Sequence, residues 1–536
     1  MTSTTTKRLL FALILLIYAV YAGVYIYKTS FVLSGQRFFV LFDDAMISMR
    51  YARNLADGYG LVWNPGAERV EGYTNPLWVV FMAVFHTFPI PASKMSLLIQ
   101  ISGGIFLMAN LFFVKVIAAE LSRNWLVGML AVVLTAFYTP LNNWGLQGME
   151  VSLLTLILSV VIWLSLRYFR TGNFSPWLYG LLGLSTLIRV DMAVPYLVVL
   201  GFLVIAVPGQ RRQNLLWGLG LLVVFIGSQT LFRLVYYGDL LPNTYYLKMS
   251  GSPILLRLAS GFYALVQFIW SLNWVLFLIP LVVLVFRRDR FVLLPFLLVA
   301  GQLAYSVYVG GDAWEHRGGS NRYISMIMPA FFILFVYTVD LARTAAESKF
   351  QLREVRIQAY TNLGLILFVL ASMINFNFLE NFRSLERWAL LRQPLFVEGN
   401  KEYVRISLAL EKITKPQARI AVVSAGAIPY FTDRYAIDLL GKNDVRIAHL
   451  DARSTGGLLN NLANFRPGHM KWDYDYSIGE LKPDVVVQLW GKTEEAQAYL
   501  DKYYVVGGAP GDLPFNLRQG SANILWERVQ LVQEGS

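Results

Sequence analysis

Two adjacent carboxylates, Asp43 and Asp44, stand shortly after the first hydrophobic segment ends. They belong to the run FDDAMISMR (42–50), which leads into an amphipathic pattern. Acidic side chains at a membrane edge are costly to desolvate and call for a functional explanation. One of them can serve as a general base toward a lipid-borne substrate. The alternative is a solvated pair of loop carboxylates that caps the following helix.

Cations and aromatic residues recur in the other loops that we predict on the same side of the membrane. Arg317 and Arg322 flank a Gly-Gly pair just before an apolar segment. Arginine side chains and the amides of glycine-rich turns suit phosphate groups. Aromatic rings stack on sugar faces, and carboxylates accept hydrogen bonds from hydroxyls. This combination indicates chemistry on a phosphate-linked, carbohydrate-like group.

Several of these residues also have a structural interpretation, and the sequence leaves it open. Arg50 and Arg53 lie three residues apart on a predicted amphipathic helix, which suits contact with lipid headgroups. Arg189 and Asp191 suit a buried ion pair as well as substrate contact. Glu150 suits either a direct role or the orientation of its neighbours.

The composition is that of a polytopic membrane protein. Of the 536 residues, 56% are apolar and 15% are charged, whereas soluble domains carry about 25% charged residues. The net charge of +12 follows from Lys and Arg in predicted cytoplasmic loops, so it does not indicate nucleic acid. There is no Cys, and the four His residues lack ligand spacing. A divalent cation at Asp43 and Asp44 stays open, because two carboxylates are too few ligands to define a metal site.

The apolar pattern predicts about eleven transmembrane helices. Residues 9–27 follow Lys7-Arg8, which predicts an uncleaved anchor with a cytoplasmic N-terminus. Loop 28–75, with the acidic pair, is then external. Residues 76–88 are too short for an ordinary span, and we predict a re-entrant or interfacial segment.

After about residue 375 the composition becomes that of a soluble domain. We expect a transmembrane domain over 1–375 and an extracytoplasmic α/β domain over 376–536. Predicted strands at 419–424 and 484–489 alternate with helical patterns at 402–413 and 494–503.

Several blocks resemble one known family in order and spacing. The first loop contains DDAMISMRYARNL (43–55), GYGLVWNPG (58–66) and ERVEGYTNPLW (68–78). Shorter matches are LQGME (146–150), LIRVD (187–191), PNTYYLK (242–248), GGD (310–312), AGAIPYF (425–431), IDLLG (437–441) and GHMKWDYDY (468–476). The chain resembles the GT-C class of polyprenyl-phosphate-sugar glycosyltransferases. Within that class it is most similar to the branch of the actinobacterial terminal arabinofuranosyltransferases.

The resemblance implies an inverting transfer of a sugar, such as arabinofuranose, from a polyprenyl-phosphate donor to a glycan, lipid or protein acceptor of the cell envelope. Asp43, ahead of Asp44, would be the general base. Lys248, Arg317 and Arg322 would contact the donor phosphate. The further substrate contacts that we expect come from Glu71, Tyr73, Asn75, Glu150, Arg189, Asn243 and Asp312. The implied location is the bacterial plasma membrane, with the chemistry on its external face.

Two other function classes compete with this hypothesis. A transporter or flippase for a lipid-linked sugar would place ionisable residues near the bilayer midplane, in broken and inverted repeats. The predicted spans show neither feature. A glycan-binding envelope scaffold would need only the C-terminal domain and not about eleven spans.

Overall fold

The computed structural model describes residues 3–532 except 315–318, 352–353, 380, 454–461 and 463. The chain forms two compact units, each assembled from three separated segments. Unit 1 comprises Met1–Thr29, Gln100–Gln229 and Arg257–Leu395. Unit 2 comprises Ser30–Ile99, Thr230–Leu256 and Phe396–Ser536. The chain passes between the units within α4 (Ala92–Leu121), α10 (Arg211–Tyr237) and α12 (Ile254–Ser271).

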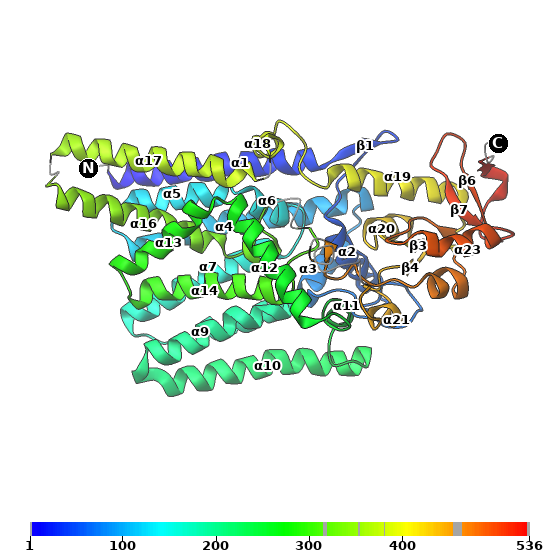
Figure 1. Ribbon diagram of the computed structural model, residues 1–536, viewed down its shortest axis with the longest axis horizontal. Helices are drawn as coiled ribbons and strands as arrows, with labels where there is room; N and C mark the ends of the chain where they lie inside the picture. Colours follow the sequence, from blue (N-terminus) through cyan, green and yellow to red (C-terminus); the bar gives the residue numbers. More distant parts are fainter. Residues whose placement is uncertain are drawn as a thin grey trace. The chain divides into compact units, whose positions relative to one another are not determined.

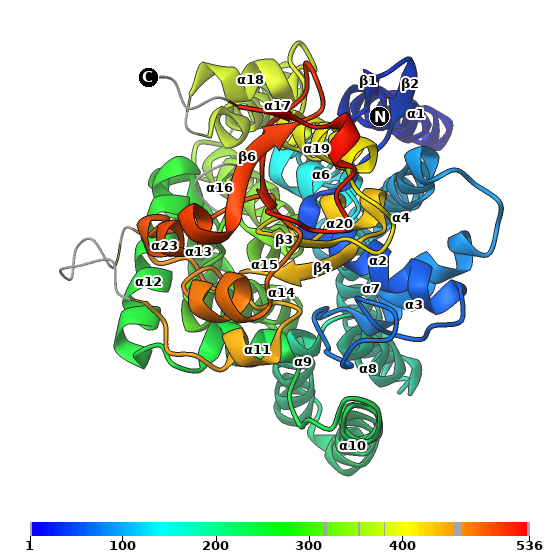
Figure 2. The same cartoon turned by 90° about the vertical axis from the view of Figure 1, so that its right-hand side faces the viewer.

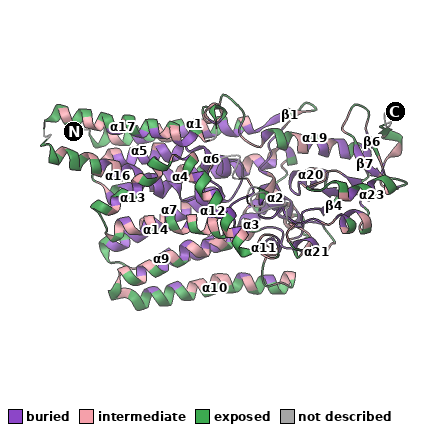
Figure 3. Cartoon of the chain, in the orientation of Figure 1, coloured by how far each residue is buried: buried purple, intermediate pink, exposed green. Residues whose placement is uncertain are grey.

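Unit 1 is helical (Figure 1). Its helices are α1 (Thr4–Thr29), α5 (Trp125–Ala136), α6 (Thr139–Leu146), α7 (Val151–Thr171), α8 (Trp177–Ile188), α9 (Ala193–Ala206), α13 (Trp274–Phe286), α14 (Arg290–Tyr308), α15 (Arg322–Ser325), α16 (Met328–Lys349), α17 (Val355–Phe378) and α18 (Phe382–Trp388). Helix α16 packs against α5, α13 and α14, and most of its first half is buried. Figure 3 shows the contrast with α17, which is largely exposed.

Among the described residues, eight helices are long and apolar enough to cross a membrane. They are α1, α4, α7, α10 with the short turn before it, α12, α14, α16 and α17. The pair α5 and α6, bent by 56°, makes nine if it counts as one span. Shorter apolar helices are α3 (Pro76–His86), α8, α13 and the stretch Val190–Ala206 that includes α9. The predicted polytopic helical architecture is therefore confirmed.

The predicted number of about eleven spans exceeds these long helices because local breaks shorten several of them. The span predicted from near Phe262 is interrupted after Ser271, and Asn273 adopts a φ of 72° there. The Asn273 side chain then caps α13 by accepting from the Val275 amide at 3.1 Å. The spans predicted near Trp177 and Met192 are the shorter helices α8 and α9, separated at Arg189 and Asp191. The segment predicted as 76–88 is α3, with 11 residues.

Unit 2 combines short helices with a six-stranded sheet (Figure 2). Strand order is β4 (Tyr435–Asp438), β3 (Arg419–Val422), β5 (Val485–Val486), β7 (Phe515–Arg518), β6 (Tyr504–Gly508) and β8 (Gln530–Leu531). β3 pairs in parallel with β4 and β5, and the other pairs are antiparallel. The hairpin β1 (Phe31–Leu33) and β2 (Gln36–Phe38) belongs to the same unit. The helices are α2 (Asp43–Ala56), α3, α11 (Asn243–Met249), α19 (Val397–Ile413), α20 (Ala427–Thr432), α21 (Val445–Ala448) and α23 (Glu494–Tyr503).

The predicted strands and helices of the C-terminal segment occur at the predicted places, although β5 covers only two residues. Strands β4, β6, β7 and β8 were not predicted. The division at residue 375 followed composition, whereas packing groups Ser30–Ile99 and Thr230–Leu256 with the C-terminal segment. The external location of these parts stays a prediction.

Arg50 of α2 holds the first loop to the C-terminal segment within unit 2. Its guanidinium donates to the carbonyls of Trp63 at 2.6 Å and Arg434 at 2.9 Å, and also to that of Pro429. A further bond of 2.9 Å reaches the Asn64 side chain. The residue is only 1% exposed. Arg50 therefore has a structural role inside unit 2, and the predicted contact with lipid headgroups does not describe it.

We expect Arg50→Lys to lower the thermal unfolding midpoint of the purified protein. A single ammonium cannot reach every acceptor that the guanidinium satisfies, and each buried acceptor left unpaired costs about 1–3 kcal/mol. Arg405→Lys, whose side chain is 48% exposed on α19, is the control and should leave the midpoint unchanged. Equal midpoints for both variants would contradict this role of Arg50.

Candidate functional site

Asp43 is the first residue of α2, and its carboxylate is held by backbone amides. It accepts from the Ala427 N–H at 2.8 Å and from the Gly426 N–H at 3.4 Å, where α20 begins. The residue before it, Phe42, is the N-cap of α2, which has no side-chain cap hydrogen bond. The alternative of a solvated pair capping the following helix does not describe this arrangement.

The environment makes Asp43 a stronger base than an ordinary aspartate. Burial raises the pKa of its carboxyl to about 6, and the charge of Asp44 adds to that rise. The two amide hydrogen bonds and the charge of Lys442 act in the opposite direction. A carboxylate with a pKa near 6 is still ionised at neutral pH, and it binds a proton more readily than an exposed aspartate.

Asp44 forms an ion pair with Lys442, which follows β4. Both side chains are partly buried, with 16% and 13% exposed. The charges of Lys442, Asp44 and Lys248 all act on His469, and burial is the main reason why the pKa of its imidazole falls to about 3. This histidine is therefore neutral at physiological pH.

Lys248 of α11 belongs to the same neighbourhood. A Cβ atom on Gly468 would lie 3.3 Å from Lys248 Cε, so the lysine stem passes directly over this glycine. Two ammonium groups, Lys248 and Lys442, therefore lie near one neutral histidine and the Asp44 carboxylate. Such a surrounding suits an anionic group such as a phosphate.

The loop that carries Lys442 is fixed by polar side chains. Asp438 accepts from the Leu440 amide at 2.9 Å and from the Asn443 amide at 2.8 Å. From α11, the Asn243 amide nitrogen donates to the carbonyls of Gly441 and Lys442, each at 2.9 Å. We call residues 438–444 the lysine loop. These bonds hold the backbone of the loop from which Lys442 reaches Asp44.

The predicted first-loop residues Glu71, Tyr73 and Asn75 are buried in unit 2. Glu71 forms an ion pair with Arg233. The Tyr73 hydroxyl lies 2.8 Å from that of Tyr237. Asn75 accepts a hydrogen bond from Ser48 at 2.9 Å. These contacts support the loop, and they favour structural roles over substrate contact.

Unit 1 holds a separate cluster of predicted site residues. Arg189 donates to both oxygens of Asp191, at 2.8 and 3.1 Å, and to Glu150 at 3.1 Å. Arg322 makes a bidentate pair with Asp312 at 2.7 and 3.0 Å. All five side chains are at most 9% exposed. Three carboxylates face two guanidinium groups here, so the cluster has no excess positive charge for a phosphate.

The chain is similar in sequence or in structure to several known proteins. Residues 393–523, about a quarter of the chain, match a family described as Domain of unknown function (DUF8728). The chain is 28% identical over 222 residues to the terminal β-(1→2)-arabinofuranosyltransferase of Mycobacterium tuberculosis. That match covers 38% of this chain and 34% of the relative, so the match spans about a third of the relative's length.

The structural likenesses extend over nearly the whole chain. ArnT from Cupriavidus metallidurans, bound to undecaprenyl phosphate, matches with a TM-score of 0.55 at 13% identity, covering 97% of this chain and 99% of ArnT. The Archaeoglobus fulgidus oligosaccharyltransferase, tethered with an acceptor peptide, matches with a TM-score of 0.52 at 11% identity, covering 98% and 75%. The chain has the GT-C fold. The fold class predicted from the sequence is thereby confirmed.

Within this GT-C fold, the predicted site residues fall into the two units. Unit 2 holds Asp43, Asp44, Glu71, Tyr73, Asn75, Asn243 and Lys248, and unit 1 holds Glu150, Arg189, Asp312 and Arg322. Arg317 lies outside the described residues. Among the residues that the structure describes, no group of three or more His, Asp or Glu side chains is placed to hold a metal ion.

Sequence reasoning missed Lys442, His469 and the amides of Gly426 and Ala427 as neighbours of the acidic pair. All of them lie in or next to the C-terminal blocks that carry the family resemblance. That resemblance was the sequence feature that could have pointed to them. The resemblance identified those blocks but not the contacts that they make.

We expect Gly426→Ala to destabilise the protein. A Cβ atom at this position would lie 2.0 Å from the Asp43 carbonyl oxygen. The backbone must shift, and forced overpacking of this kind costs about 1–3 kcal/mol. Gly399→Ala is the matched control, because its nearest side-chain atoms are 4.0 Å away. Thermal unfolding of both variants measures the difference, and equal midpoints would contradict the close approach.

Proposed function

We propose that the protein is a multi-pass membrane glycosyltransferase that transfers a sugar from a polyprenyl-phosphate donor to an acceptor hydroxyl. The observation that carries the proposal is the pairing of an amide-held Asp43 with the ion pair of Asp44 and Lys442. The GT-C fold supports it, and so does the undecaprenyl phosphate bound to ArnT. The name of the curated relative supports arabinofuranose as the transferred sugar, and we propose a glycan of the bacterial envelope as the acceptor.

In the proposed mechanism, the Asp43 carboxylate takes the proton of the acceptor hydroxyl. The acceptor oxygen attacks the anomeric carbon, and the bond from that carbon to the phosphate oxygen breaks. The bonding electrons leave with the polyprenyl phosphate, and the configuration at the anomeric carbon inverts. The ammonium groups of Lys442 and Lys248 stabilise the charge that develops on the phosphate. Asp44 acts as a positioning residue for Lys442.

The proposed reaction takes place on the external face of the bacterial plasma membrane, with a cytoplasmic N-terminus. Loop residues 28–75 and the C-terminal segment then share one aqueous compartment. This placement follows from the positive charges of the alternate loops in the sequence.

We expect Asp43→Asn to reduce transfer about 10²–10⁴-fold, because an amide cannot accept the proton. The assay uses purified protein, a panel of radiolabelled polyprenyl-phosphate sugars and an envelope extract as acceptor. Asp44→Asn should reduce transfer less and weaken donor binding, since the ammonium of Lys442 loses its partner. Asp501→Asn, on the exposed side of α23, is the control. Undiminished transfer by Asp43→Asn would disprove the assignment of the base.

We expect kcat/KM to rise with pH along an acid limb near pH 6, because only the ionised form of Asp43 accepts a proton. The positive charge of Lys442 lowers the pKa of Asp43. In Lys442→Met this pKa rises, so the acid limb moves to higher pH in addition to any loss of phosphate binding. Lys492→Met, an exposed site, should keep the limb in place. If the pH profile of Lys442→Met, scaled to the same maximal kcat/KM, coincides with that of the wild type, the charge of Lys442 does not act on the pKa of Asp43.

A further inference from the structure

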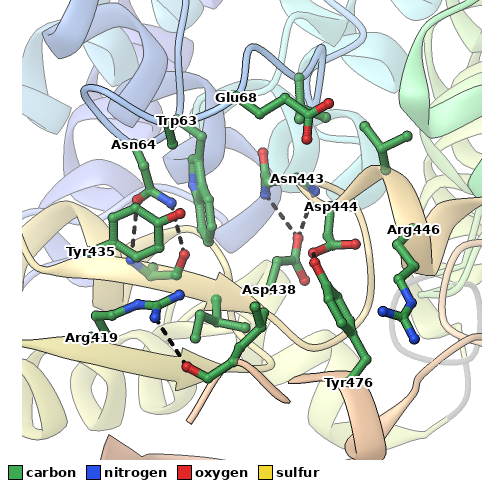
Figure 4. A pocket seen from close by; sticks show the side chains of 16 residues that line it. Trp63, Asn64, Glu68, Arg419, Tyr435, Asp438, Asn443, Asp444, Arg446 and Tyr476 are labelled. Atoms are coloured by element: carbon green, nitrogen blue, oxygen red, sulfur yellow. Dashed lines mark hydrogen bonds between the residues drawn. The ribbon is translucent and has the colours of Figure 1, made fainter. Parts of the chain in front are cut away.

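Unit 2 contains a polar pocket that the proposed reaction does not use. Its volume is about 170 Å³. Figure 4 shows side chains converging on it from the first loop, from strands β3 and β4, from the lysine loop and from the segment around Tyr476. The labelled lining residues are Trp63, Asn64, Glu68, Arg419, Tyr435, Asp438, Asn443, Asp444, Arg446 and Tyr476. Drug-sized ligands need about 300–1,000 Å³, so this pocket has the scale of a single small ring.

Three aromatic rings in the lining are held in place by cations. Arg50 lies over the Trp63 ring at 5.3 Å, Arg419 over Tyr435 at 5.1 Å, and Arg446 over Tyr476 at 4.2 Å, each measured to the ring centroid. Stacked guanidinium groups fix ring orientation. The pocket therefore has rigid aromatic walls, and such walls bind a ligand with little loss of side-chain entropy.

Some polar groups of the lining are occupied by the scaffold. Asp438 accepts from Asn443, and Asn64 bonds to the backbone of Ala436. Glu68 and the Tyr435 hydroxyl, by contrast, make no hydrogen bond with other described residues. Glu68 is exposed to solvent at the pocket. These two groups are available to a ligand.

The charge of the lining selects the ligand class. It contains three carboxylates, Glu68, Asp438 and Asp444, and two guanidinium groups. One of those, Arg446, is already paired with Glu480 at 2.8 Å. The excess of negative charge disfavours a phosphate, whereas carboxylates accept hydrogen bonds from hydroxyls and aromatic faces pack against the C–H groups of a sugar ring.

Two short segments connect this pocket to the acidic pair. The Trp63 indole donates to the Ala425 carbonyl at 3.2 Å, directly before the two amides that hold Asp43. In the lysine loop, Lys442 pairs with Asp44 while the next residue, Asn443, lines the pocket. Neighbouring residues of the same two backbone segments therefore take part in the pocket and in the acidic pair.

We propose that this pocket binds a neutral sugar ring of the acceptor glycan, one that precedes the ring bearing the attacking hydroxyl. The assignment of this sugar to the acceptor rests on the proposed function. The binding of a sugar ring in the pocket does not depend on catalysis. The contacts come from the walls of Trp63, Tyr435 and Tyr476, with Glu68 as an acceptor for a ring hydroxyl.

The test measures sugar binding and transfer separately on the full-length protein in detergent. The probes are methyl α-D-arabinofuranoside and methyl α-D-glucopyranoside, followed by saturation-transfer NMR, with inorganic phosphate as an anionic comparison. The variants are Tyr435→Ala and Glu68→Gln. Tyr59→Ala and Glu398→Gln, both exposed positions of unit 2 outside the pocket, are the matched controls.

We expect saturable binding of at least one glycoside, weakened about tenfold or more by each pocket variant and unchanged in the controls. A tenfold loss corresponds to about 1.4 kcal/mol. Asp43→Asn should keep this binding. In the transfer assay, the pocket variants should raise the acceptor KM and leave kcat and the donor KM near wild type.

Absence of glycoside binding to the wild type, or binding that survives both pocket variants, would overturn the proposal. Glycoside binding lost in both variants without any change in the acceptor KM would overturn its acceptor part. If Asp43→Asn keeps full transfer while the pocket variants lose sugar binding, the assignment of the base fails and the pocket assignment stands.

Discussion

The hydrogen bonds between the Asp43 carboxylate and the amides of Gly426 and Ala427 are the constraint on which the site depends. They join parts of the chain that are more than 380 residues apart. The amides lower the pKa of this carboxylate, but burial is the larger effect and raises the pKa to about 6. The close approach leaves no room for a Cβ at Gly426. This contact therefore sets the position of Asp43, whereas burial, and not the contact, raises its base strength.

The two units each hold a group of charged candidate residues, and the balance of positive and negative side chains differs between them. In unit 2, the ammonium groups of Lys248 and Lys442 and a neutral His469 lie near the carboxylates of Asp43 and Asp44. In unit 1, carboxylates outnumber the guanidinium groups. Buried pairs of this kind are costly to break because each partner would be left uncompensated.

The sequence predicted the membrane-protein class and the strands β3 and β5, because hydropathy and residue patterns report these features directly. The pair of Arg189 and Asp191, two residues apart, was one of the alternatives that the sequence left open, and the structure forms it. The sequence did not predict partners that lie far along the chain. Glu71 was a candidate for substrate contact, and the structure pairs it with Arg233. Lys442 was missed for the same reason, since it meets Asp44 across nearly 400 residues.

Unit 2 consists of three separate chain segments, and the last of them in the sequence is Phe396–Ser536. During synthesis the first loop leaves the ribosome long before the amides of Gly426 and Ala427 and the ammonium of Lys442 exist. Until that final segment is made and folded, Asp43 and Asp44 have neither of these partners. For most of translation, the two carboxylates of the nascent chain therefore lack these amide and ammonium partners. The charged centre can assemble only after the C-terminal segment has been synthesised.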